Sequence, residues 1–111
     1  MMKHVLFKLE GCPFSTLNNE EHIKYCLFHA SEASYSKVLK VQTEKFLPQG
    51  VTGFALLAES HLSIHTWPEK GVAMCDIFTC GEKCDPHKAV EYLGKAFKAK
   101  QIESDAFDRL L

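Results

Sequence analysis

Short stretches of the chain alternate between hydrophobic and polar positions, which is typical of strands in a sheet with one buried face. In the first stretch, Val5, Phe7 and Leu9 share one side. The stretch from Val51 to Glu59 is instead mostly apolar, which favours a strand buried on both faces. Strands are predicted over Met2 to Leu9, Lys37 to Thr43, Val51 to Glu59, Ser60 to Thr66 and Val72 to Cys80.

The stretch from Ser60 to Thr66 either forms its own strand or continues the strand before it. Its alternation separates the side chains into two kinds, because successive residues of a strand point to opposite faces. Leu62, Ile64 and Thr66 lie on one face, and His61, Ser63 and His65 lie on the other.

Two segments have the spacing of apolar positions that indicates helices with one buried face. The first begins after Asn18 or Asn19, and Glu21 stands where a capping box would place it relative to Asn18. The second begins at Asp85-Pro86, a capping residue followed by a proline in the first turn. The apolar stripes are Ile23, Cys26, Leu27, Ala30 and Ala33 in the first helix, and Ala89, Val90, Leu93, Ala96 and Phe97 in the second.

Short turns between successive strands imply an antiparallel sheet, with the two helices covering one face. The predicted fold is therefore α+β, a two-layer sandwich in a single domain over residues 1–111. The segment from Gln101 to Leu111 fits a short strand or a short helix equally well. Because Val51 to Leu57 is apolar on both sides, the second face of the sheet also needs cover, and we expect a second copy of the chain to supply it in a dimer.

The composition is that of a soluble globular protein, since 46% of the 111 residues are hydrophobic and 24% are charged. The formal net charge is −1, and the basic residues are spread along the chain. This speaks against a protein that binds nucleic acid or a membrane surface. No apolar run could span a bilayer and the N-terminus does not have the pattern of a signal peptide, so we expect a cytoplasmic protein.

Five cysteines without a secretory signal do not predict a disulfide framework. His61, His65, Cys80 and Cys84 are all residue types that bind zinc. Their spacing matches no standard ligand set, however, and no pair is spaced Cys-x-x-Cys. We therefore expect no metal site.

One segment concentrates residues that carry out chemistry. It reads Glu59-Ser60-His61-Leu62-Ser63-Ile64-His65-Thr66-Trp67-Pro68-Glu69, and it places a nucleophilic hydroxyl among two imidazoles and two carboxylates. Imidazoles titrate near neutral pH and therefore move protons readily. The segment predicts catalysis, including a reaction of the chain with itself.

The same segment, extended back to Leu56 and followed by Asp76-Ile77-Phe78-Thr79-Cys80-Gly81, resembles the prokaryotic S-adenosylmethionine decarboxylase proenzyme. The resemblance covers most of the chain. It continues in Gly11-Cys12, in Phe46-x-Pro48-Gln49-Gly50-Val51 and in Asp85-Pro86.

The resemblance implies that the chain cuts itself between Glu59 and Ser60. The hydroxyl of Ser60 would attack the carbonyl of Glu59 and convert the amide into an ester. Abstraction of the Ser60 α-proton, the role that the family gives to the position of His65, would then cleave the ester. The products would be a β chain of residues 1–59 and an α chain of residues 60–111 that begins with a pyruvoyl group.

The resemblance also implies how the mature enzyme works. The pyruvoyl ketone made from Ser60 would form a Schiff base with the substrate amine and accept electrons as carbon dioxide leaves. Cys80 would return a proton to the substrate carbon. Phe46 would stack on the adenine, Glu69 would bind the ribose hydroxyls, and Thr52 and Leu62 would line the pocket. In this family the active sites draw on both protomers of a homodimer, which becomes (αβ)2 after cleavage.

Two alternatives remain open. A pyruvoyl enzyme on the same scaffold could decarboxylate ornithine or arginine, although Phe46 and Glu69 favour a nucleoside substrate. An uncut paralogue could act as a regulatory subunit, but such a protein has no need of Ser60, His65 and Cys80. The preferred interpretation is an S-adenosylmethionine decarboxylase that supplies the aminopropyl donor for spermidine synthesis.

Overall fold

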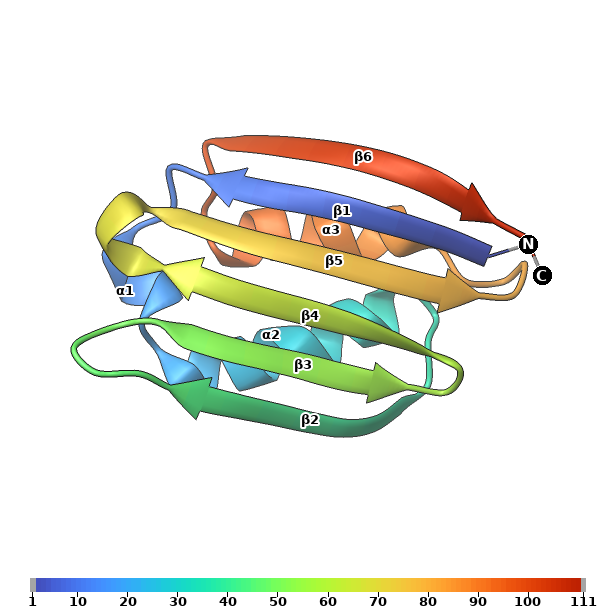
Figure 1. Cartoon of the computed structure of the whole chain (residues 1–111), viewed down its shortest axis with the longest axis horizontal. Helices are drawn as coiled ribbons and strands as arrows, with labels where there is room; N and C mark the ends of the chain where they lie inside the picture. Colours follow the sequence, from blue (N-terminus) through green and yellow to red (C-terminus); the bar gives the residue numbers. More distant parts are fainter. Residues whose placement is uncertain (1, 111) are drawn as a thin grey trace.

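The computed structural model describes residues 2–110, which form one antiparallel sheet with helices on one of its faces (Figure 1). This confirms the predicted α+β sandwich. The strands are β1 (Met2–Glu10), β2 (Val38–Lys45), β3 (Val51–Leu57), β4 (Ser60–Trp67), β5 (Val72–Cys80) and β6 (Gln101–Arg109). The helices are α1 (Phe14–Leu17), α2 (Glu20–Ala33), the 3₁₀ turn η1 (Pro68–Lys70) and α3 (Pro86–Ala96).

The strands lie side by side in the order β2-β3-β4-β5-β1-β6, and each neighbouring pair is antiparallel. The first strand of the sequence thus lies between the last two strands. The C-terminal segment, which the sequence left undecided, forms the edge strand β6 beside β1. Its pattern was ambiguous because every residue of β6 has an exposed side chain.

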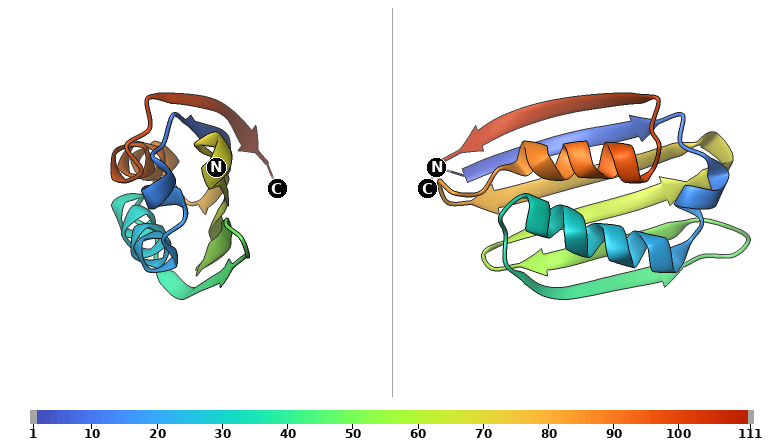
Figure 2. Two further views of the ribbon diagram at one scale, coloured as in Figure 1. Left: turned by 90° about the vertical axis from the view of Figure 1, so that its left-hand side faces the viewer. Right: turned by 180° about the vertical axis from the view of Figure 1, so that it is seen from behind.

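The helices α2 and α3 lie against one face of the sheet, and the opposite face is bare in a single chain (Figure 2). Each helix buries the apolar stripe that its sequence predicts, except that Ala33 and Ala96 at the helix ends are only half-buried. The side chain of Asp85 accepts a hydrogen bond from the backbone of His87, so Asp85 caps α3 as predicted.

The sequence offered two candidates for the residue that caps α2, Asn18 and Asn19, and the structure selects the second. Asn19 is the cap, and its side chain accepts a hydrogen bond from the backbone of His22. The capping box between Asn18 and Glu21 does not form. The side chain of Asn18 instead accepts a hydrogen bond from the backbone of Gly50, a contact over 32 positions that local pattern cannot reveal.

The prediction that the strand from Val51 is buried on both faces is wrong for the single chain. β3 ends at Leu57, and its outward residues Phe54 and Leu56 are 38% and 43% exposed. An apolar run does not distinguish a face covered by helices from a face left bare. We call the uncovered side of the sheet the open face, and its exposed apolar residues are Leu6, Phe54, Leu56, Trp67, Met74 and Phe107.

Candidate active site

A two-residue turn joins β3 to β4, because Leu57 pairs with Ser60 and leaves only Ala58 and Glu59 between the strands. Glu59 has a φ of 65°, in the left-handed region that residues with a Cβ atom avoid. Holding such a residue there costs on the order of 1 kcal/mol. The bond between Glu59 and Ser60 therefore follows a strained position at the tip of a hairpin.

Cys80, the last residue of β5, reaches this turn. Its Sγ atom lies 3.5 Å from Oε2 of Glu59 and donates a hydrogen bond to it. This hydrogen bond, with a smaller contribution from desolvation, raises the pKa of the Cys80 thiol. The thiol beside the candidate cleavage bond is therefore held in its protonated form. We call Glu59, Ser60 and Cys80 the Ser60 group.

Four of the other predicted site residues lie at the opposite end of the sheet. Thr52 pairs with His65, and Thr52 Oγ1 lies 3.0 Å from His65 Nδ1. Phe46 follows the end of β2 and Glu69 lies in η1, just beyond β4. We call Phe46, Thr52, His65 and Glu69 the His65 group. These residues lie at the ends of β2 and β4 and at the start of β3, which is the end of the sheet away from the hairpin between β3 and β4 (Figure 1).

Strand geometry separates the two groups by a large distance. Ser60 and His65 are five residues apart on one extended strand, so their Cα atoms are about 16 Å from each other. The imidazole of His65 thus cannot reach the α-proton of Ser60 in the same chain. Within one chain, the structure does not bring the predicted site together.

Leu62 requires a correction. Its predicted place was among the residues that line the pocket, but its side chain is 0% exposed and lies in the core beneath the helices. The reason is the alternation along β4, in which Leu62 and Ile64 point inward while His61 and Ser63 point to the open face. Leu62 therefore supports the strand from below, and we leave it out of the proposed pocket.

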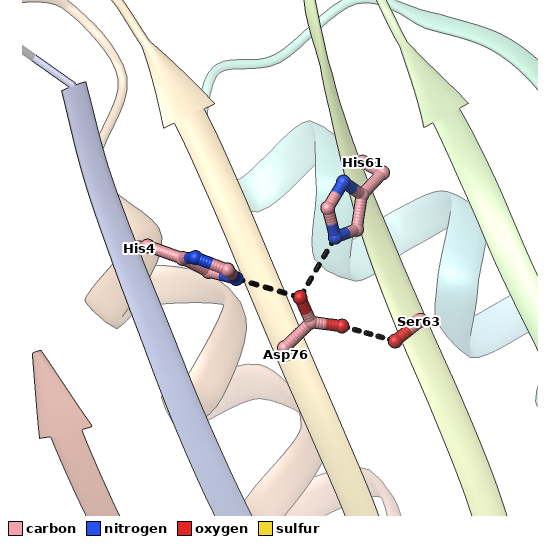
Figure 3. A network of polar contacts seen from close by, with 4 residues as sticks. All are labelled: His4, His61, Ser63 and Asp76. Atoms are coloured by element: carbon pink, nitrogen blue, oxygen red, sulfur yellow. Dashed lines mark hydrogen bonds and ion pairs between the residues drawn. The ribbon is translucent and has the colours of Figure 1, made fainter. Parts of the chain in front are cut away.

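Next to the Ser60 group, the open face carries a polar network centred on Asp76 of β5 (Figure 3). His4 Nε2 and His61 Nε2 each lie 2.7 Å from Asp76 Oδ2. Ser63 donates its hydroxyl hydrogen to Asp76 Oδ1. Neither His4 nor this role of Asp76 was predicted, because the register that aligns β1, β4 and β5 cannot be read from local pattern.

The network keeps Asp76 ionised. Burial alone would raise the pKa of this carboxyl group, but the hydrogen bonds from Ser63, His4 and His61 outweigh burial and hold the pKa below its ordinary 3.8. Because a carboxylate only accepts hydrogen bonds, each imidazole is the donor and uses its Nε2 atom.

The residues whose positions could hold a metal ion differ from the four that were set aside on the basis of their spacing in the sequence. Within residues 2–110, one group offers three ligand atoms that lie within 4.8 Å of one another, and it consists of His4, His61 and Asp76. His65 lies a strand's length from Cys80, so the set of His61, His65, Cys80 and Cys84 does not converge. Burial raises the pKa of Cys26 to about 11, and the pKa values of the thiols of Cys12 and Cys75 are raised for the same reason, as expected of structural cysteines.

The comparisons with known proteins bear on the same segments. The family model described as S-adenosylmethionine decarboxylase matches residues 3–110. The S-adenosylmethionine decarboxylase proenzyme of Methanococcus maripaludis is 45% identical over 101 residues, which cover 91% of this chain and 83% of the relative. The chain belongs to the S-adenosylmethionine decarboxylase family. The resemblance seen in the sequence is thereby confirmed.

Further relatives in the S-adenosylmethionine decarboxylase family agree in extent and fold. The proenzyme of Acetivibrio thermocellus is 42% identical over 107 residues, covering 96% of this chain and 86% of the relative. The crystal structure of the adenosylmethionine decarboxylase from Aquifex aeolicus superposes with a TM-score of 0.91 at 32% identity, covering 100% of this chain and 92% of that one. Among residues 2–110 of this family member, no helix is long and apolar enough to cross a membrane.

In this S-adenosylmethionine decarboxylase family member, a small hollow of about 130 Å³ is lined in part by Thr52, and two larger hollows lie on the open face. One of about 390 Å³ lies over Trp67, Lys70 and Met74, and another of about 320 Å³ lies over Leu6, Met74 and neighbours on β6. Ser60, His65 and Cys80 line neither of them. In a single protomer, His65 is exposed, and Ser60 and Cys80 are half-buried.

The hydrogen bonds that Asp76 accepts are expected to contribute to the free energy of unfolding, and this contribution can be measured. In a Ser60→Ala background, so that cleavage does not enter, Asp76→Asn is expected to lower the free energy of unfolding at pH 7 by about 2 kcal/mol, because three donors lose a charged acceptor. The pKa of Asp76 is lower in the folded chain than in the unfolded one. The stabilisation is therefore present above about pH 4 and is lost as the pH falls through the folded-state pKa.

Urea denaturation at pH 7 and pH 3 measures this difference. Asp105→Asn, which changes an exposed carboxylate of β6, serves as the control and is expected to shift stability by less than about 0.5 kcal/mol. A loss from Asp76→Asn that is equally large at both pH values would contradict the assignment of an ionised Asp76 as the common acceptor.

Proposed function

We propose that the chain is a self-processing S-adenosylmethionine decarboxylase that converts its own Ser60 into a pyruvoyl cofactor and supplies decarboxylated S-adenosylmethionine for spermidine synthesis. The observation that carries this proposal is the environment of the bond between Glu59 and Ser60. The bond follows a residue of left-handed φ in a two-residue turn, and the thiol of Cys80 contacts that residue. Family membership supports the reaction and the substrate.

Cleavage proceeds through an ester and then a dehydroalanine residue. The Ser60 hydroxyl adds to the Glu59 carbonyl, the C–N bond breaks and an ester with a free amine forms. Glu59 is held at a left-handed φ in the uncut chain, so an ester that lets this residue relax would be favoured by on the order of 1 kcal/mol. Removal of the Ser60 α-proton then expels the Glu59 carboxylate. Water replaces nitrogen on the remaining dehydroalanine, ammonia leaves, and a pyruvoyl group caps residues 60–111.

The residues around Ser60 fit the cofactor that would form there. The pyruvoyl group supplies a ketone that captures the substrate amine and withdraws electrons during loss of carbon dioxide. Cys80 carries a proton on Sγ, held there by its hydrogen bond to Glu59 in the uncut chain. After cleavage Glu59 becomes the end of the β chain, and the thiol is free to give its proton to the substrate carbon.

A second protomer completes the site. His65 lies about 16 Å along β4 from Ser60, so we infer that the imidazole which removes the Ser60 α-proton comes from the partner. The exposed apolar side chains of the open face supply a surface on which two sheets can pack. If the two copies run in opposite directions, such packing would bring the His65 group of one protomer to the Ser60 group of the other. Thr52 holds Nδ1 of the incoming His65 and leaves Nε2 for the proton.

The His65 group also carries the residues proposed to bind substrate. Phe46 presents a 47% exposed ring suited to stacking on adenine, and Glu69 presents an exposed carboxylate suited to two ribose hydroxyls. The comparisons give no support to the alternative substrates ornithine and arginine, or to an uncut regulatory paralogue, since the relatives described above are all named for S-adenosylmethionine decarboxylase.

Release of labelled carbon dioxide tests the choice of substrate. With carboxyl-labelled S-adenosylmethionine, ornithine and arginine in parallel, we expect release from the first alone, because stacking and ribose contacts have no counterpart in the amino acids. Release from ornithine or arginine at a comparable rate would instead identify the protein as a pyruvoyl-dependent decarboxylase of that amino acid.

A further inference from the structure

We propose that Asp76 is a positioning residue which, through His61, fixes the new chain end at residue 60 after cleavage. The inference rests on the proposed function, because it concerns the cut chain. It assigns a task to the network of His4, His61, Ser63 and Asp76, which the cleavage chemistry leaves unused (Figure 3).

Cleavage removes the strongest restraint on residue 60. In the uncut chain the two-residue turn ties Ser60 to β3, where it pairs with Leu57. Once the bond is broken, residue 60 is a chain terminus, and chain ends fray unless they are held. On the β5 side the pairing begins only with His61 and Phe78, so the register gives residue 60 no partner there.

The next residue, His61, is held by its side chain. Its Nε2 atom donates to Asp76 Oδ2 at 2.7 Å, a diagonal contact because Asp76 pairs with Ser63 rather than with His61. The ring also packs on Phe78, with 6.2 Å between the ring centroids. The first residue after the reactive group is therefore anchored to β5 in two ways.

Asp76 is itself fixed from both sides, as an anchor must be. Ser63 of β4 donates to Oδ1, and His4 of β1 donates to Oδ2 at 2.7 Å. The ring of His4 also packs against Phe78, with the centroids 5.3 Å apart. The carboxylate therefore ties together β1, β5 and β4. Because residue 60 belongs to β4 and Cys80 to β5, a ketone at residue 60 would be held in a fixed place relative to Cys80.

The turnover number per ketone group distinguishes a positioning role of Asp76 from a role in stability alone. We compare wild type with Asp76→Asn, an almost isosteric change, and with His61→Phe, which keeps a ring on Phe78 but removes the donor. The ketone content of each preparation is titrated with a carbonyl-trapping reagent, and kcat is expressed per ketone at 25 °C. Both variants are expected to be cut, with kcat about tenfold lower because the reactive group is misplaced. KM should stay within about twofold, because Phe46 and Glu69 lie in the other group.

The matched control is Glu91→Gln, which changes an exposed carboxylate on α3, in the helix layer and not on the open face, and kcat per ketone is expected to equal that of wild type. The proposal is overturned if both variants match wild type in kcat per ketone, or if KM rises while kcat is unchanged. It is also overturned if neither variant is cut, because the network would then act before the chain end exists. A wild-type chain that is never cut overturns the proposed function itself, so cleavage of the wild-type chain is measured before any variant is tested.

Discussion

Ser60→Ala is expected to leave the chain whole and without decarboxylase activity. An alanine has no hydroxyl to attack the Glu59 carbonyl, so neither the ester nor the ketone can form, and the reaction loses its electron sink. The expected change is from nearly complete cleavage to none, read as the mass of the intact chain after days near neutral pH. Because Ser60 supplies both the nucleophile and the carbon atoms of the ketone, this one change removes the processing reaction and the cofactor together.

Ser104→Ala is a suitable control for this variant, since it removes a hydroxyl from the exposed edge strand β6. It should be cut at the same rate as wild type. Cleavage of Ser60→Ala chains between residues 59 and 60 would show that another nucleophile opens the bond, and the proposed mechanism would then be wrong.

Mixed protomers should restore what each variant alone has lost. Ser60→Ala lacks the nucleophile, and His65→Ala is expected to stall at or before the ester. If His65 acts on the partner's Ser60, a mixed dimer contains one complete site, made of Ser60 from the His65→Ala chain and His65 from the Ser60→Ala chain. With random pairing after co-expression, about a quarter of the sites should be complete.

The identity of the cut chain makes this test specific. Mass spectrometry should find α-chain fragments that carry the His65→Ala substitution, because only those chains retain Ser60. Absence of any cleavage in confirmed mixed dimers would contradict action between protomers. Wild-type cleavage of His65→Ala on its own would remove His65 from the mechanism altogether.

Much of the fold could be predicted from local pattern. The strand over Val72–Cys80 and the helix that begins after Asp85 are found as predicted, because alternation and capping are properties of neighbouring residues. The faces of β4 were also predicted correctly. The contact of Asn18 with Gly50 and the pairing of β6 with β1 were not, since both depend on residues far away in the sequence.

The residues of the candidate site also divide into those that could be predicted from the sequence and those that depend on distant strands. The resemblance singled out Ser60, His65 and Cys80, and the structure places Cys80 beside the turn of Ser60 through the register of β4 and β5. The separation of His65 from Ser60 could have been foreseen, because five residues of a strand span about 16 Å. The Asp76 network could not, because it depends on β1 lying next to β5, which joins His4 to Asp76 over 72 positions.

The most direct test of self-processing is the intact mass of the purified wild-type protein, before and after treatment with a carbonyl-trapping reagent. We predict two fragments, residues 1–59 and 60–111, of which only the second gains the mass of the reagent. A single 12.6 kDa chain that persists for days near neutral pH and never takes up the reagent would contradict the central claim.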